Sequence, residues 1–274
     1  MDGLSTSSAI YDKIEKELQE YASSYRSTNY TDTYNQATGL SSAQYIQLKQ
    51  KMLKSIYTNG GFYVGRYEAG IVNSYRNFGA DFTTVHPITE TAVIKSNTYP
   101  FNWITCSQAQ SLASQMSSGE YTSSLMFGLQ WDLIMKYLET KGISQYSLSE
   151  NSTSWGNYIN NSFNLMNTKA KYAEYDLSNG VLSEWLSAET YEKKTNIVAL
   201  LITASNNSFS KQKIYDLAGN MFEWTLENSS DSAATSVVRG GGCNCEGNVD
   251  PASIRFNCTT DYSLPNISFR VSIF

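Results

Sequence analysis

Asp216 and Glu223 are the acidic side chains best placed in the sequence to act together, because they stand on either side of a turn at Gly219. Glycine can take the left-handed backbone conformation that such a turn needs. Two carboxylates and the carbonyl oxygens of a turn suit a hard cation such as calcium. The structural alternative is that Asp216 caps the turn and Glu223 pairs with an arginine, such as Arg239 or Arg270.

Three of the four cysteines, Cys243, Cys245 and Cys258, lie close together in the C-terminal part of the chain. Thiolates act as nucleophiles and bind soft metals, but nothing in the sequence brings Cys258 to either of the other two. The single histidine, His86, precedes Pro87. A three-histidine metal site is therefore impossible, and a Ser-His-Asp triad would need this loop histidine. The sequence predicts no catalytic residues and no enzyme.

The elements around the cysteines indicate what must position them. Residues 239–242 read Arg-Gly-Gly-Gly, and no Lys-Ser/Thr pair or helix start follows, so they do not form a phosphate-binding loop. They are typical of a turn or bulge where backbones approach closely. A regular strand over 269–274 ends the chain. We expect residues 216–224, 239–242 and 269–274 to form a frame that holds the irregular polar run between them.

Composition excludes several classes of function. Only 16% of the residues are charged and the net charge is −5, which argues against a nucleic-acid-binding protein. No apolar run approaches the ~20 residues of a membrane helix, and the N-terminus lacks the basic and apolar regions of a secretory signal. We therefore expect synthesis in a reducing cytoplasm. The 20 tyrosines, with many Ser, Asn and Thr, are typical of adaptable contact surfaces.

Hydrophobic periodicity predicts an α+β protein with an N-terminal helical segment, residues 1–60, and a larger domain, residues 61–274. The N-terminal helices either pack on that domain or form an oligomerisation or attachment stem. Ser107 with Gln110 makes a possible capping box. The expected elements are helices over 7–25 and 41–57, a strand end leading into a helix over 102–116, and a helix within 124–141. Strands are expected over 61–70 and 196–204, and irregular stretches over 26–39, 73–97 and 150–182.

The turn resembles the motif Asn/Asp-x-x-Gly-Asn-x-Trp-Glu-Trp of the formylglycine-generating enzyme-like proteins, and here reads Asp-Leu-Ala-Gly-Asn-Met-Phe-Glu-Trp over 216–224. Matches in the family's order cover residues 61–274. The resemblance implies a C-type lectin-type fold with small twisted sheets and long loops. It also implies calcium bound by the side chains of Asp216 and Glu223 and the carbonyl oxygens of Gly219 and Met221. The other matching stretches are Gly65-Arg66-Tyr67-Glu68, Pro100, Gln130-Trp131-Asp132, Arg239-Gly240-Gly241 and Phe269-Arg270-Val271.

The enzymes of that family use two cysteines in the segment after the glycine entry. Cys245 stands about where the first belongs, but the place of the second is near Asp250, which is not a thiol. This departure argues against a catalytic thiol or a copper site in this chain.

The C-terminal segment also resembles the variable proteins of diversity-generating retroelements, found in phages and gut bacteria, which share the lectin-type fold. Those proteins read Arg-Gly-Gly, a varied patch, Pro-Ala-Ser-x-Arg, a second varied patch, Thr-Thr, a third, then Ile-Gly-Phe-Arg-Val. Ser268 replaces the usual glycine here, and residues 152–158 match upstream. The matching positions are Arg239-Gly240-Gly241, Pro251-Ala252-Ser253, Arg255, Thr259-Thr260, Ile267 and Phe269-Arg270-Val271.

In that family, template adenines are mutagenised, mostly at asparagine codons, and the residues between the fixed points of this chain are reachable in that way, except Glu246. The resemblance therefore implies a variable region over 239–274, in which Ile254, Phe256, Tyr262 and Leu264 are apolar anchors. The predicted ligand-binding residues are Cys243, Asn244, Cys245, Asn248, Val249, Asp250, Ile254, Phe256, Asn257, Cys258, Tyr262, Leu264, Pro265 and Asn266.

The sequence thus predicts a non-enzymatic ligand-binding or receptor-binding protein with a diversified C-terminal surface. We expect a phage receptor-binding protein or a prophage-encoded display protein, made in the cytoplasm without a signal peptide and carried on the virion or the bacterial cell surface. Its expected partner is a protein or glycan on a target cell, with no nucleic acid and no membrane insertion, and it can form a homo-oligomer. The alternatives are an oxidase of the formylglycine-generating type and a structural virion protein.

Overall fold

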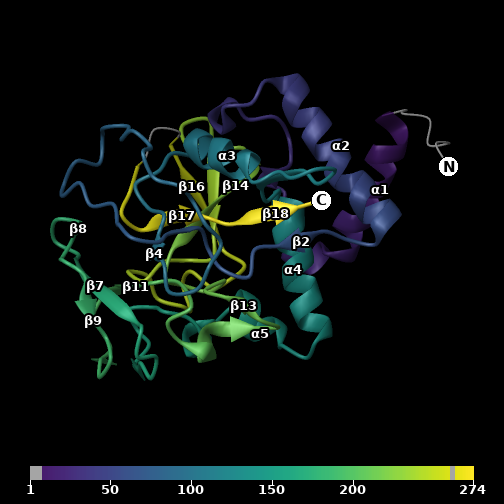
Figure 1. Cartoon of the computed structure of the whole chain (residues 1–274). Coiled ribbons are helices and arrows are strands. Elements are labelled where there is room, and N and C mark those ends of the chain that lie inside the picture. The colour runs from purple at the N-terminus through teal and green to yellow at the C-terminus, as the bar shows by residue number, and fades with distance from the viewer. Residues whose placement is uncertain (1–7, 260–262) are drawn as a thin grey trace.

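A computed structural model of the chain describes residues 8–259 and 263–274. Helices are mixed with several small sheets joined by long loops, so the predicted α+β class is confirmed (Figure 1). No helix in these two ranges is both long enough and apolar enough to cross a bilayer. The α-helices are α1 (Ser8–Tyr21), α2 (Ser42–Asn59), α3 (Cys106–Gln115), α4 (Gly128–Thr140) and α5 (Gln145–Ser149).

The main sheet has the order β1-β14-β15-β16, with antiparallel neighbours, and β17 runs parallel to the first half of β14. Its strands are β1 (Tyr30–Thr31), β14 (Phe222–Ser229), β15 (Ser236–Arg239), β16 (Arg255–Cys258) and β17 (Ile267–Phe269). The end of the turn motif, the glycine entry and most of the predicted variable region therefore lie on or between strands of one sheet.

Smaller sheets surround the main one. A three-stranded sheet joins β2 (Tyr63–Val64), β18 (Val271–Ile273) and β5 (Ser123–Leu125). A second group joins β7 (Lys171–Asp176), β8 (Val181–Leu182), β9 (Leu186–Ser187) and β11 (Ala199–Leu201). The two-stranded pairs are β3 (Gly70–Ile71) with β4 (Tyr99–Pro100), β6 (Phe163–Asn164) with β10 (Glu192–Lys193), and β12 (Ser210–Lys211) with β13 (Ile214–Tyr215).

Alternation along β14 gives the main sheet two different faces. Phe222, Trp224 and Leu226 point to an apolar core that α3 covers, and the Trp224 indole donates a hydrogen bond to the Ile104 carbonyl at 2.9 Å. The acidic and hydroxyl residues between them point to the opposite face. Buried side chains of α4 form a second core there with Trp155, Tyr158 and Leu217.

The N-terminal segment packs directly on the larger domain. β1 pairs with the end of β14, and Tyr45, Met52 and Leu53 of α2 belong to the same core as Trp224. Asp32 is buried and accepts hydrogen bonds from the Gly128 and Leu129 amides at 2.7 and 2.9 Å. The first turn of α4 is thereby capped by a residue about one hundred positions earlier in the chain. Of the two sequence interpretations of this segment, packing matches this arrangement.

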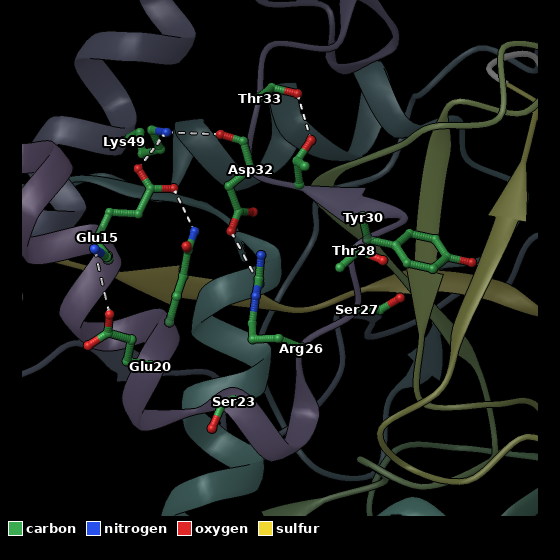
Figure 2. A pocket seen from close by; sticks show the side chains of 13 residues that line it. Glu15, Glu20, Ser23, Arg26, Ser27, Thr28, Tyr30, Asp32, Thr33 and Lys49 are labelled. Atoms are coloured by element: carbon green, nitrogen blue, oxygen red, sulfur yellow. Dashed lines mark hydrogen bonds and ion pairs between the residues drawn. The ribbon is translucent and has the colours of Figure 1, made fainter.

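A polar pocket of about 850 Å³ lies between α1, α2 and residues 26–33 (Figure 2). Figure 2 shows Lys49 reaching both Glu15 and the Asp32 backbone, and Arg26 pointing toward the Asp32 carboxylate. Arg26 also donates to Asp132 of α4 at 2.8 Å. The floor of the pocket is thus bonded to α4, and no predicted ligand-binding residue lines it.

Several boundaries differ from the sequence prediction. The capping box of α3 uses Thr105 and Gln108, not Ser107 and Gln110. Thr105 has the extended backbone of an N-cap residue, and its amide donates a hydrogen bond to the Gln108 side chain. The Gln108 amide in turn donates to the Thr105 hydroxyl. Of 61–70, only β2 and the first residue of β3 are strand. Within 196–204, only Ala199–Leu201 is strand, although its neighbours are buried.

The prediction of an irregular stretch over 150–182 is wrong for Lys171–Asp176, which forms β7 and pairs with β11. Its sequence, Lys-Tyr-Ala-Glu-Tyr-Asp, carries charge at both ends and buries little besides Ala173, so hydrophobic alternation does not mark it. β1 was also missed inside the predicted loop 26–39, because a two-residue strand has no periodicity.

Replacement of Asp32 by alanine should destabilise the whole domain, because two buried amides of α4 lose their acceptor. We expect a loss of about 1–3 kcal/mol in the free energy of unfolding, measured by urea denaturation. Asp12→Ala, at an exposed position of α1, is the matched control and should change stability little. Equal stability of the two variants would show that Asp32 does not hold α4.

Candidate functional site

The glycine entry lies at the start of the predicted variable region. Gly240 and Gly241 have φ values of +90° and +77°, which favour glycine. A Cβ on Gly241 would lie 2.4 Å from the Asp250 carbonyl oxygen. The Gly240 carbonyl accepts from the Tyr158 hydroxyl at 3.0 Å and from the Gly219 amide at 2.8 Å. The turn motif, the glycine entry and the upstream segment 152–158 therefore meet at one point.

Residues 152–158 also hold the backbone of the variable region further along. The Ser152 amide donates to the Gly247 carbonyl at 2.8 Å, and its hydroxyl accepts from the Ala252 amide at 2.9 Å. The Trp131 indole donates to the Ala252 carbonyl at 2.9 Å. Thr153 packs so close to Gly247 that a Cβ there would lie 2.5 Å from its backbone nitrogen. These contacts are a physical reason for the match at residues 152–158, which pattern alone does not explain.

Arg239 and Arg255, which both match fixed positions of the variable-protein pattern, belong to a buried network of ion pairs. Arg239 donates to Glu227 and Asp132, each at 2.9 Å. Arg255 donates to Glu227 at 2.8 Å and to both oxygens of Asp132 at 2.7 and 2.6 Å. Burial alone would raise the pKa of Glu227, but the guanidinium groups of Arg239 and Arg255 hold it below its usual value. Arg255 also donates to the Tyr25 carbonyl at 2.7 Å, so the N-terminal segment closes the network.

The predicted ligand-binding residues fall into three groups by exposure. Asn248, Val249 and Phe256 are exposed, with Val249 at 62% and Phe256 at 52%. Tyr262 lies outside the described residues. The partly exposed members are Asn244, Cys245, Asp250, Ile254, Asn257 and Leu264.

Four predicted ligand-binding residues are buried, which corrects the sequence prediction for them: Cys243, Cys258, Pro265 and Asn266. Cys243 packs with Met221 and Leu200, and Cys258 packs in the core of the main sheet. These side chains do not reach the surface. The irregular sequence gave no period from which their direction could be predicted.

Side chains outside the variable region contribute to the same surface. Phe222 of the turn motif lies beneath Phe256, with ring centroids 5.7 Å apart. The Asn160 amide donates to the Asn248 side chain at 2.7 Å. Sequence reasoning missed the role of Asn160, because only the fold brings it to the variable region.

The thiols are in environments that suppress their reactivity. Burial raises the pKa of Cys243 and of Cys258 to about 12. Burial, reinforced by the charge of Asp250, also raises the pKa of Cys245. Thiolates, not thiols, are nucleophiles and metal ligands, so none of these three is an activated cysteine.

The predicted calcium ligands are bonded to other parts of the protein. Glu223 accepts from Arg270 with both carboxylate oxygens, including contacts of 3.1 and 2.9 Å from Nε. Asp216, with φ of +54°, accepts from the Ala204 amide at 2.7 Å. No group of three or more His, Cys, Asp or Glu residues in the described ranges is placed to hold a metal ion. Glu223 pairs with an arginine, as the structural alternative has it, whereas Asp216 is bonded to the Ala204 amide and not to the turn at Gly219. These bonds occupy oxygens that a calcium ion would need, and calcium with the Gly219 and Met221 carbonyl ligands stays a prediction.

A third carboxyl group lies in the same interior. Glu68 is fully buried and accepts from the Asn220 side-chain amide, while its Oε2 has no hydrogen-bond partner among the described residues. Burial, with the charges of Asp216 and Glu223, raises the pKa of Glu68 well above its usual value. Burial also raises the pKa of Asp216 to about 7. The Arg270 guanidinium opposes these shifts and lowers the pKa of all three acids, but burial outweighs it.

Comparison with known proteins yields a distant structural similarity and no family. No protein-family model matches the chain, and no curated protein matches it in sequence. Among solved structures, the chain is similar to Treponema denticola variable protein 1, with 13% sequence identity, a TM-score of 0.38, and coverage of 77% of this chain and 84% of that one. The C-type lectin-type fold stays a prediction at this level of similarity.

The three buried acids Glu68, Asp216 and Glu223 should make the protein less stable as pH rises. The folded state binds more protons than the unfolded state between about pH 4 and pH 7, because the pKa of Asp216 rises from 3.8 to about 7 and that of Glu68 rises as well. The free energy of unfolding should therefore fall as pH rises through this window. Glu68→Gln should flatten the slope, measured by urea denaturation at several pH values. Glu174→Gln, at an exposed position, should keep the wild-type slope, and an equally steep slope in Glu68→Gln would contradict the assignment.

The cysteines should resist alkylation in the native protein. With a pKa near 12, the thiolate fraction at pH 8 is roughly a thousand-fold lower than for an ordinary thiol. We expect iodoacetamide to label Cys243 and Cys258 slowly in buffer and rapidly in urea, as read by mass spectrometry of digested protein. Labelling of either residue in buffer at the rate seen in urea would reveal an accessible and activated thiol.

Proposed function

We propose that this chain is a non-enzymatic ligand-binding protein that presents varied side chains from a rigid backbone in its C-terminal region. The observation that carries the proposal is the separation of backbone from side chains. The backbones of Gly247 and Ala252 are bonded to residues 131 and 152, whereas the side chains of Asn248, Val249 and Phe256 point to solvent.

This arrangement has the two properties that a diversified binding site requires. The exposed side chains can change without breaking a hydrogen bond that the backbone makes, so the fold survives many sequences. A backbone that is ordered before binding also loses less entropy when a ligand arrives. Phe256 over Phe222 supplies an apolar anchor, and the surrounding Asn side chains supply adaptable hydrogen bonds.

The environment of the potential catalytic groups favours binding over an oxidase. The thiol pKa values are raised, and Asp250 stands near the place of a second cysteine. His86 is buried, stacks on Phe78 with ring centroids 3.7 Å apart, and directs Nε2 to the Asp81 carbonyl at 3.1 Å. These contacts are those of a histidine packed within the fold, with one ring nitrogen engaged by a backbone carbonyl.

The partner that suits this surface is a protein or glycan on a target cell, and the carrier is a phage virion or a bacterial cell surface. Receptor binding by a phage and display by a prophage-carrying cell use the same surface in the same way. The second candidate, a structural virion protein, has no use for an exposed Phe256 beside solvent-facing asparagines, and we rank it lower for that reason.

The neighbouring DNA tests the diversification itself. We expect a near-copy of the segment that encodes residues 239–270, differing mainly at adenines, beside a gene for a reverse transcriptase. Sequencing of the genomic flanks provides the measurement. Absence of such a copy would remove diversification from the proposal and leave a ligand-binding protein with one fixed specificity.

Phe256→Ala should weaken binding without unfolding the protein. The probe is fluorescently labelled protein applied to a panel of bacterial strains, read by flow cytometry. Central aromatic anchors typically contribute 2 kcal/mol or more, so we expect at least a roughly tenfold loss of affinity with a Tm lowered by only a few degrees. Met166→Ala, 91% exposed and outside the variable region, is the control. Equal binding by the two variants would contradict the proposed surface.

A further inference from the structure

Lys193 is a lysine in an unusual place, because its side chain is fully buried on β10. Lysine is almost never completely buried unless its charge is matched. No carboxylate of the described residues lies within ion-pair distance of its ammonium group. The charge must therefore be stabilised in another way.

Backbone carbonyl oxygens supply that stabilisation. The Lys193 ammonium donates to the carbonyls of Tyr158 and Asn161, each at 2.8 Å. The carbonyls of Ile159 and Lys194 lie further away, at 3.4 and 3.5 Å. An ammonium group has three donors, so it can join several carbonyls that otherwise repel one another, as a bound metal ion does.

The carbonyl oxygens that accept from the ammonium favour its charged form. Burial acts in the opposite direction and lowers the pKa of Lys193 to about 8. The Phe163 ring centroid is 5.4 Å from the ammonium nitrogen, within the range of a cation–π contact.

The turn over residues 158–161 that Lys193 holds is the one that supports the first varied patch, residues 243–250. The Ile159 amide donates to the Cys245 carbonyl at 2.9 Å. The Asn160 side chain accepts from the Gly247 amide at 3.1 Å and donates to the Asn248 side chain at 2.7 Å. Every one of these contacts starts from the turn that the ammonium ties together.

We propose that Lys193 is an internal cation that positions residues 243–250, taking the place that a bound metal ion would have in holding a loop. The carbonyl oxygens of the turn converge on the ammonium, and the turn in turn fixes the backbone of the patch. The role of the patch in ligand binding rests on the proposed function, but its positioning by Lys193 does not.

Hydrogen exchange with peptide mass spectrometry tests the positioning directly. In Lys193→Met the amides of Ile159 and Gly247 should exchange at least about tenfold faster, because hydrogen bonds to charged groups are the stronger ones. The Leu226 amide, bonded to the Met126 carbonyl in the main sheet, should keep its protection. Lys194→Met is the matched control, because Lys194 is exposed and pairs with Glu192 at the surface. Unchanged exchange in Lys193→Met, or equal acceleration at Leu226, would overturn the proposal.

Chemical rescue separates the charge from simple filling of space. Lys193→Ala removes three methylene groups and the ammonium, so n-propylammonium chloride should restore protection of Ile159 and Gly247. The uncharged analogue n-propanol and sodium chloride at the same concentration should not restore it. Rescue by n-propanol to the same extent would show that Lys193 only fills space, and would overturn the proposal. If exchange behaves as expected and Phe256→Ala leaves cell binding unchanged, only the proposed function fails.

Discussion

Arg239 and Arg255 face each other across β15 and β16, and the rest of the structure depends on how this pair is neutralised. Like charges directly opposite in a sheet are destabilising, and both guanidinium groups are largely removed from water. Glu227 and Asp132 lie between them and each accepts from both. A buried ion pair is weak support for stability in itself, because desolvation opposes the attraction. Removal of either acid would leave buried guanidinium groups without a counter-charge, which is strongly destabilising.

The network also explains why the N-terminal helices belong to the same core. Arg26 adds a third guanidinium group on Asp132, and the Tyr25 carbonyl accepts from Arg255. Glu227 lies against the first turn of α4 so closely that a Cβ on Gly128 would be 2.3 Å from its side chain. The positive end of that helix favours nearby acids. The predicted boundary at residue 60 therefore does not separate two independent cores, because residues from both sides of this boundary belong to one ionic network.

Features that depend on a local sequence pattern could be predicted from the sequence. Contacts between residues that only the fold brings together could not. Helix α4 and its buried Trp131, Ile134, Met135 and Leu138 follow from periodicity, and so does the α+β class. β1 and β7 do not, because a two-residue strand and a charged one carry no alternation. At the site, the frame residues were predictable from motifs, whereas Asn160 and Lys193 were not, because their partners are backbone carbonyls and amides brought close only by the fold. Burial of Cys243 and Cys258 was equally hidden, since an irregular segment has no period that reveals which side chains point inward.

Burial of these two cysteines constrains what variation the proposed surface can have. Cys243 packs against Met221 and Leu200, and Cys258 lies in the core with Cys106, so a larger side chain at either position must displace close-packed neighbours. A free cysteine behaves in such a place as a small apolar residue. A mechanism that samples codons without regard to packing would produce many variants at these positions that fold poorly. Under the proposed function, substitutions at Asn248, Val249 and Phe256 would be tolerated best, because these side chains meet water. Thiols at the buried positions need no chemical role, because their size alone makes them acceptable.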